Sequence, residues 1–67
     1  MKLSARNQLK GTVKAVRVEG LMAEVVLDIG GQEVVSLITA DSAKRLALAT
    51  GDTVTAVIKS TEVMVAK

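Results

Sequence analysis

Residues 21–38 read LMAEVVLDIGGQEVVSLI, and this stretch decides the fold that the sequence predicts. Along residues 21–29 one parity is wholly apolar, and we expect it to face the core: Leu21, Ala23, Val25, Leu27 and Ile29. Gly30 and Gly31 supply the positive φ angles of a tight hairpin. Residues 32–38 therefore return antiparallel to residues 21–29.

The chain before and after this hairpin adds further strands. Upstream, residues 11–18 (GTVKAVRV) alternate in polarity until Val16 and Arg17, where we expect a bulge. Downstream, residues 53–59 (TVTAVIK) alternate cleanly, and residues 63–65 (VMV) form a final short strand. Five strands are predicted in all.

A short helix is predicted between the third and fourth strands. Residues 39–42 offer N-cap side chains, and residues 43–48 contain good helix formers. Ala43, Leu46 and Ala47 have the spacing of a buried stripe. Five short strands with one helix in this place are typical of a small OB-like barrel, so we expect an all-β fold of this kind. On the residues alone, an SH3-like barrel and an open meander are the alternatives.

Composition limits the chemistry. The 67 residues form one domain, 1–67, in which 49% of the side chains are hydrophobic and Phe, Tyr, Trp, His, Cys and Pro are all missing. No disulfide, zinc site or Cys–His nucleophile can be built from this set. Asp28, Asp41 and Asp52 stand beside turns or a helix start, where capping explains them. We therefore expect a binding protein, with no enzymatic activity, no catalytic residue, no catalytic cofactor and no protein atom coordinating a metal.

Size and charge indicate the partners. A domain this small is marginally stable alone and cannot use disulfides or metals, so we expect it to self-associate. The net charge of +2 is small and spread along the chain, and no aromatic side chain is available for stacking. Both facts argue against nucleic acid. No apolar stretch is long enough to span a membrane or to form a secretory signal, which predicts a cytoplasmic protein without a membrane partner.

Two polar clusters interrupt the aliphatic sequence. One is Ser4-Ala5-Arg6-Asn7-Gln8, and the other is Lys59-Ser60-Thr61. Each combines a fixed cation with hydroxyl or amide donors, which suits a tetrahedral dianion such as molybdate, tungstate, sulfate or phosphate. Taken singly, each cluster is more often an ordinary polar turn.

Longer motifs around both clusters resemble those of a known family. Residues 4–11 (SARNQLKG), followed by Val13, resemble the N-terminal signature of the molbindins, the Mop or TOBE-type molybdate-binding domains. Residues 55–64 (TAVIKSTEVM) are similar to the closing motif of that family, and residues 23–26 and 38–42 also match in kind and spacing.

The resemblance implies an OB-like barrel that assembles as a homohexamer, a trimer of dimers, and holds molybdate or tungstate between subunits. One chain would contribute Ser4, Ala5, Arg6 and Asn7, and another Lys59, Ser60 and Thr61. Ser36 and Thr39 are candidates for an additional site. The implied role is molybdenum storage or homeostasis inside the cell. The alternative is an oligomeric interaction or regulatory module that needs no ligand.

Overall fold

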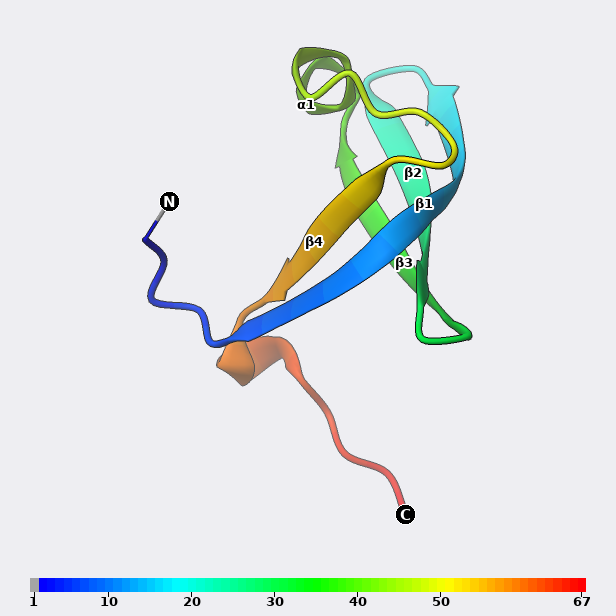
Figure 1. Cartoon of the computed structure of the whole chain (residues 1–67). Coiled ribbons are helices and arrows are strands. Elements are labelled where there is room, and N and C mark those ends of the chain that lie inside the picture. Colours follow the sequence, from blue (N-terminus) through cyan, green and yellow to red (C-terminus); the bar gives the residue numbers. More distant parts are fainter. Residues whose placement is uncertain (1) are drawn as a thin grey trace.

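The computed structural model describes residues 2–67, which form one curled antiparallel sheet and a short helix (Figure 1). The strands lie in the order β3-β2-β1-β4. The elements are β1 (Asn7–Glu19), β2 (Met22–Ile29), β3 (Gln32–Thr39), α1 (Ala40–Arg45), β4 (Thr53–Ile58) and the 3₁₀ turn η1 (Ser60–Glu62). The all-β prediction is confirmed, and the helix stands between the third and fourth strands as expected.

The β2–β3 hairpin forms where the sequence predicts it. Gly30 and Gly31 have φ angles of 60° and 88°, and the Asp28 carboxylate accepts a 2.8 Å hydrogen bond from the Gly31 N–H. The predicted inward face of β2 is buried at Ala23, Val25 and Leu27. Leu21 departs from the prediction and is 87% exposed, because β2 begins at Met22 and leaves Leu21 in the preceding turn.

Strand β1 is long and belongs to both halves of the sheet. Its first half pairs with β4, from Asn7 opposite Ile58 to Thr12 opposite Thr53, and its second half pairs with β2. Gly11 lies where the two pairings meet. A Cβ atom there would approach the Asp28 carbonyl oxygen to 2.6 Å, so the crossing of β1 over the end of β2 requires glycine.

The bulge in β1 lies earlier than predicted. The register shifts between Val13 and Ala15 and not at Val16. The cause is the loop before β4, because the Val13 N–H donates to the Asp52 carbonyl at 2.9 Å and the Val13 carbonyl accepts from Gly51 at 2.8 Å. With Val13 held in this way, Lys14 becomes the extra residue of the bulge.

Helix α1 begins and ends three residues earlier than the helix formers 43–48 predict. Thr39 is its N-cap, and the Thr39 hydroxyl accepts the Ser42 N–H at 3.1 Å. The helix ends at Arg45, and Ala47 follows in the left-handed region with φ 50°. The predicted stripe is therefore correct only at Ala43, which is buried, whereas Leu46 is 65% exposed.

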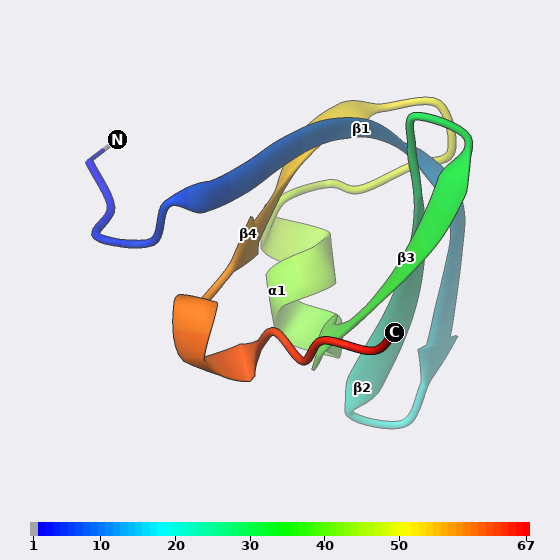
Figure 2. The same cartoon turned by 90° about the horizontal axis from the view of Figure 1, so that it is seen from below.

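The predicted fifth strand, residues 63–65, is wrong within this chain. After η1 the chain continues without regular structure, and Figure 1 shows the tail leading away from the strands, whereas Figure 2 views the sheet from below with the tail in front of it. Met64 and Val65 are each 93% exposed. The described residues therefore form a four-stranded half-barrel, open between its edge strands β3 and β4.

The core lies on the concave face of this half-barrel. Its buried cluster is Val13, Val25, Leu27 and Ala56, with Val16, Ile29, Val34, Ile38, Leu48 and Val54 packed against it. Aliphatic residues from all four strands contribute, as the alternation in the sequence predicts.

Candidate functional site

Both predicted polar clusters lie at the same end of the β1–β4 ladder. Asn7 and Ile58 are the last paired residues there, so residues 4–6 and 59–61 leave the sheet beside each other. Figure 1 shows the segment before β1 and the turn η1 at this same end of the ladder. One chain thus places at the same end of its β1–β4 ladder all the predicted residues: Ser4, Ala5, Arg6, Asn7, Lys59, Ser60 and Thr61. The contribution of the two clusters by two different chains remains a prediction.

The N-terminal cluster forms a short turn before β1. Ser4 and Arg6 are exposed, whereas Ala5 and Asn7 are half-buried. The side-chain amide of Gln8 donates a 2.8 Å hydrogen bond to the Ala5 carbonyl, three residues back. This bond closes a loop around Arg6 and Asn7.

The C-terminal cluster is shaped by η1. Lys59 is extended, with φ −62° and ψ 135°, and its carbonyl accepts the Glu62 N–H at 2.9 Å. Ser60 and Thr61 are exposed on this turn, and within residues 2–67 neither of their N–H groups has a backbone acceptor. Two backbone donors and two hydroxyl donors are therefore available beside the Lys59 ammonium.

The positive charges of the two polar clusters, on Arg6 and Lys59, are available to an anion. The ion pairs among the described residues are Lys14–Glu33 and Arg17–Glu24, both on other parts of the sheet. Within residues 2–67 neither Arg6 nor Lys59 has a carboxylate within ion-pair distance. Glu62 is the only acidic residue on the two segments that carry the clusters. The region is thus locally positive, and positive potential concentrates anions.

Ser36 and Thr39, the candidates for an additional site, lie on β3 and not with the clusters. Strands β3 and β4 are opposite edges of the sheet. The Thr39 hydroxyl is occupied by the helix cap and donates to the Ser42 Oγ at 2.8 Å. Ser36 is half-buried opposite Val25 on the concave face.

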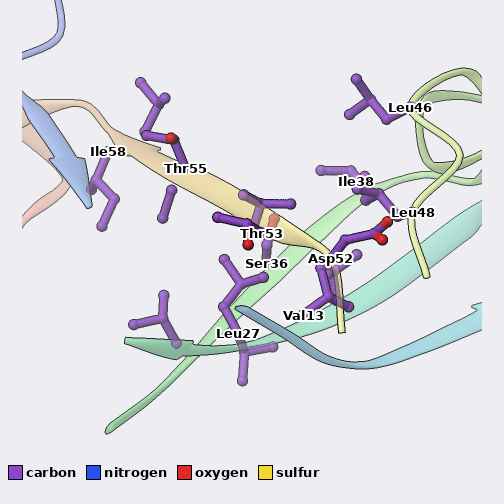
Figure 3. Close-up of a pocket in the computed structure, with 16 residues that line it drawn as sticks. Val13, Leu27, Ser36, Ile38, Leu46, Leu48, Asp52, Thr53, Thr55 and Ile58 are labelled. Carbon is purple, nitrogen blue, oxygen red and sulfur yellow. The ribbon is translucent and has the colours of Figure 1, made fainter. Parts of the chain in front are cut away.

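A groove that the sequence analysis did not anticipate occupies the concave face between β3 and β4 (Figure 3). It has a volume of about 720 Å³, and most of its labelled lining is aliphatic, with Ser36, Thr53, Thr55 and Asp52 as polar members. None of the seven predicted site residues lines it. The signal for it in the sequence is the mostly apolar inward parity of both edge strands, which leaves apolar surface uncovered where the sheet stays open.

The described part of the chain offers neither a cation site nor a membrane-spanning helix. No group of three acidic side chains converges in residues 2–67 as a candidate cation site. No helix there is long and apolar enough to cross a membrane.

Comparisons with known proteins agree with this architecture. Residues 3–65 match the family described as TOBE domain. Molybdenum-pterin-binding protein 3 of Clostridium pasteurianum is 54% identical over 66 residues, which are 97% of each chain.

Solved structures of related proteins have the same fold as this chain. A molybdate binding protein from Sporomusa ovata superposes with a TM-score of 0.96 at 48% identity, over 100% of both chains. The cytoplasmic molybdate-binding protein ModG superposes with a TM-score of 0.85 at 43% identity, over 90% of this chain and 43% of that one. The similarity confirms the OB-like fold class, and the chain belongs to the TOBE domain family and, within it, to the molbindins.

Proposed function

We propose that residues 1–67 form one oxyanion-binding domain that holds molybdate or tungstate at Ser4–Asn7 and Lys59–Thr61. The observation that carries this proposal is the placement of both clusters at one end of the β1–β4 ladder, with two cations that have no carboxylate partner in residues 2–67. The Clostridium relative is named for binding molybdenum-pterin and the Sporomusa protein for binding molybdate. These names support a molybdenum oxyanion as the ligand.

The donor set suits a tetrahedral dianion. Arg6 and Lys59 offset its two negative charges, and Arg6 can donate two parallel hydrogen bonds to neighbouring oxygens. The hydroxyls and N–H groups of Ser60 and Thr61 add neutral donors. The metal's own oxygens accept all of these bonds, so no protein atom needs to coordinate molybdenum or tungsten.

We further propose that the chain works as a homo-oligomer, a hexamer built as a trimer of dimers, with each anion held between subunits. Two observations support association of copies. The open concave groove of about 720 Å³ exposes part of the aliphatic core, and the tail carries Val63, Met64 and Val65 at exposures of 50% to 93%. Apolar surface of this kind is typical of an interface between chains.

Storage or homeostasis of molybdenum in the cytoplasm is the role that fits a small binding domain. We assign it no enzymatic activity, no catalytic cofactor, and no nucleic-acid or membrane partner. The ModG protein that it resembles is described as cytoplasmic, which supports the location. The apolar groove favours a second candidate, an oligomeric interaction or regulatory module that needs no ligand.

Titration calorimetry with molybdate, tungstate and sulfate tests the proposal. The double variant Arg6→Ala/Lys59→Ala should abolish molybdate binding and leave the oligomer intact. The matched control Lys44→Ala/Arg45→Ala also removes one lysine and one arginine, here from the last turn of α1, and should bind molybdate like the parent. Absence of heat with the parent protein would exclude the oxyanion function and favour the ligand-independent module. Loss of the oligomer in the Arg6/Lys59 variant would assign these residues to an interface.

A further inference from the structure

We propose that Gln8 is a positioning residue of the oxyanion site. Its side-chain amide holds the Ser4–Asn7 turn in one shape before the anion arrives, so that the donors of this turn are ordered in the empty protein. The inference rests on the proposed function, and it adds a residue that does not itself contact the ligand.

The sheet gives no reason for a glutamine at position 8. Gln8 is exposed and is paired with Val57, which is also exposed, on the convex side of β1 and β4. It contributes nothing to the buried core. A β-branched or aromatic residue would suit this strand position better, so the function of the amide lies outside the sheet.

The Gln8 side chain folds back toward the N-terminus. Its Nε2 atom lies 2.8 Å from the carbonyl oxygen of Ala5, and because a carbonyl can only accept, the amide group donates. Within residues 2–67 this is the only hydrogen bond that a side chain makes to the segment before β1. The backbone of residues 2–6 makes no turn or loop hydrogen bonds of its own. The shape of the turn therefore depends on Gln8.

An ordered turn favours binding. A segment that samples many conformations must be ordered when the anion binds, and the lost entropy weakens affinity. With the Gln8 hydrogen bond in place, the turn is already ordered when the protein folds, so this entropy is lost on folding and not on binding. One net intramolecular hydrogen bond corresponds to about a three- to tenfold change in the dissociation constant.

The test compares Gln8→Met with Gln32→Met in the full-length oligomer. Methionine keeps the length of the side chain and removes the donor. Gln32 is the other glutamine of the chain, is exposed at the start of β3, and makes no side-chain hydrogen bond within residues 2–67. Sodium molybdate is titrated by calorimetry, and backbone ¹⁵N order parameters are measured for Ala5 and Arg6 without ligand.

We expect Gln8→Met to bind molybdate about three- to tenfold more weakly. Its order parameters at Ala5 and Arg6 should fall from about 0.85 to below about 0.6, the range of a flexible backbone. Melting temperature should fall by a few degrees, because the folded state loses about one net hydrogen bond, whereas oligomer mass should remain that of the parent. Gln32→Met should match the parent in every measurement.

Three outcomes overturn the inference in distinguishable ways. Unchanged affinity in Gln8→Met would show that the hydrogen bond does not matter for binding. Weaker binding with unchanged order at Ala5 and Arg6 would make Gln8 a ligand contact and not a positioning residue. A parent protein that gave no heat with molybdate would exclude the proposed function, and the positioning role with it.

Discussion

The β2–β3 hairpin and the β4–tail region are both rich in aliphatic residues, yet only the hairpin contains a strand, β2, that is paired on both sides within one chain. On β2 the inward residues Val25 and Leu27 are 2% and 5% exposed. In the β4–tail region, Val57 and Val63 are 47% and 50% exposed, and Met64 is 93% exposed. Similar sequence therefore gives a closed structure in one region and an open one in the other.

The two regions differ in how many of their residues have strand partners within the chain. The hairpin is closed by a two-residue turn, and every residue of β2 has a partner on β3, from Met22 opposite Thr39 to Ile29 opposite Gln32. Strands β3 and β4 are both edge strands, but β4 is followed by a tail that has no strand partner among the described residues. Self-association is the step that would complete the second region, and the two polar clusters lie at its end. Variants can therefore separate stability that arises within the chain from stability that arises between chains.

The largest effect is expected at Gly11, where β1 joins the two regions. In Gly11→Ala the new Cβ would lie 2.6 Å from the Asp28 carbonyl oxygen, and backbone cannot move aside as a side chain can. Overpacking of this kind costs about 1–3 kcal/mol, and we expect the upper half of that range in urea denaturation. Thr12→Ala, at the exposed neighbouring residue, should cost less. Equal losses in the two variants would mean that the close approach of β1 and β2 is not what Gly11 provides.

A smaller effect, on association alone, is expected at Met64. If a second copy covers the tail, Met64→Asp places a charge in an apolar interface and weakens association about tenfold, or about 1.4 kcal/mol. Sedimentation at several protein concentrations measures this change. The matched control is Leu21→Asp, at another exposed aliphatic residue, 87% exposed in the β1–β2 turn. A tail that stays exposed in the oligomer would make the two variants indistinguishable from the parent.

The sequence predicts the closed region well because local residue chemistry determines it. Gly30 and Gly31 define the turn, Asp28 caps it, and Thr39 begins the helix, all through contacts within three residues along the chain. The bulge escapes prediction because loop residues nearly forty positions away hold Val13 in place. The fifth strand escapes prediction because residues 63–65 are apolar but have no strand partner among the described residues.

The sequence predicts which residues make up the candidate site, but it does not predict how the fold arranges them. The residue types of both clusters indicate anion binding, and the family resemblance joins them. Their adjacency at one end of the β1–β4 ladder depends on the register of Asn7 with Ile58, a pairing between distant residues that no local pattern encodes. The role of Gln8 is equally hidden, because a polar residue on an exposed strand face needs no special explanation until its hydrogen bond is seen.

A modest gain in stability is expected at the connection between the two regions. Ala47 has φ 50°, and its N–H donates to Lys44 while the Leu48 N–H donates to Ala43, so it occupies the helix-ending position that glycine prefers. Ala47→Gly relieves about 1 kcal/mol of strain but also adds freedom to the unfolded chain. We expect a net gain of about 0.5 kcal/mol, seen as a rise of about 2–4 °C in Tm. Ala49→Gly should lower Tm, and a fall in both would mean that α1 does not hold Ala47 in this conformation in solution.

The smallest effect is expected from the ion pair between Lys14 and Glu33, which joins the bulge of β1 to the hairpin. The hydrogen bond to Glu33, and then the charge of Glu33, raise the pKa of Lys14 above its ordinary 10.5. A raised pKa in the folded state stabilises the protein fully below the unfolded value, and this contribution is lost as pH rises through the folded value. The Tm difference between parent and Lys14→Met should therefore be small near neutral pH and vanish in strong alkali.

Salt gives an independent check on the same pair, because both side chains are more than half exposed, at 58% and 54%. Screening at about 1 M salt, where the Debye length is about 3 Å, should remove the Tm difference near neutral pH. A difference that survived both salt and alkali would come from packing of the aliphatic part of Lys14 against the bulge, and not from its charge. The bulge would then be held by apolar contact, as the rest of the closed region is, and the charged rim of the hairpin would contribute nothing to its closure.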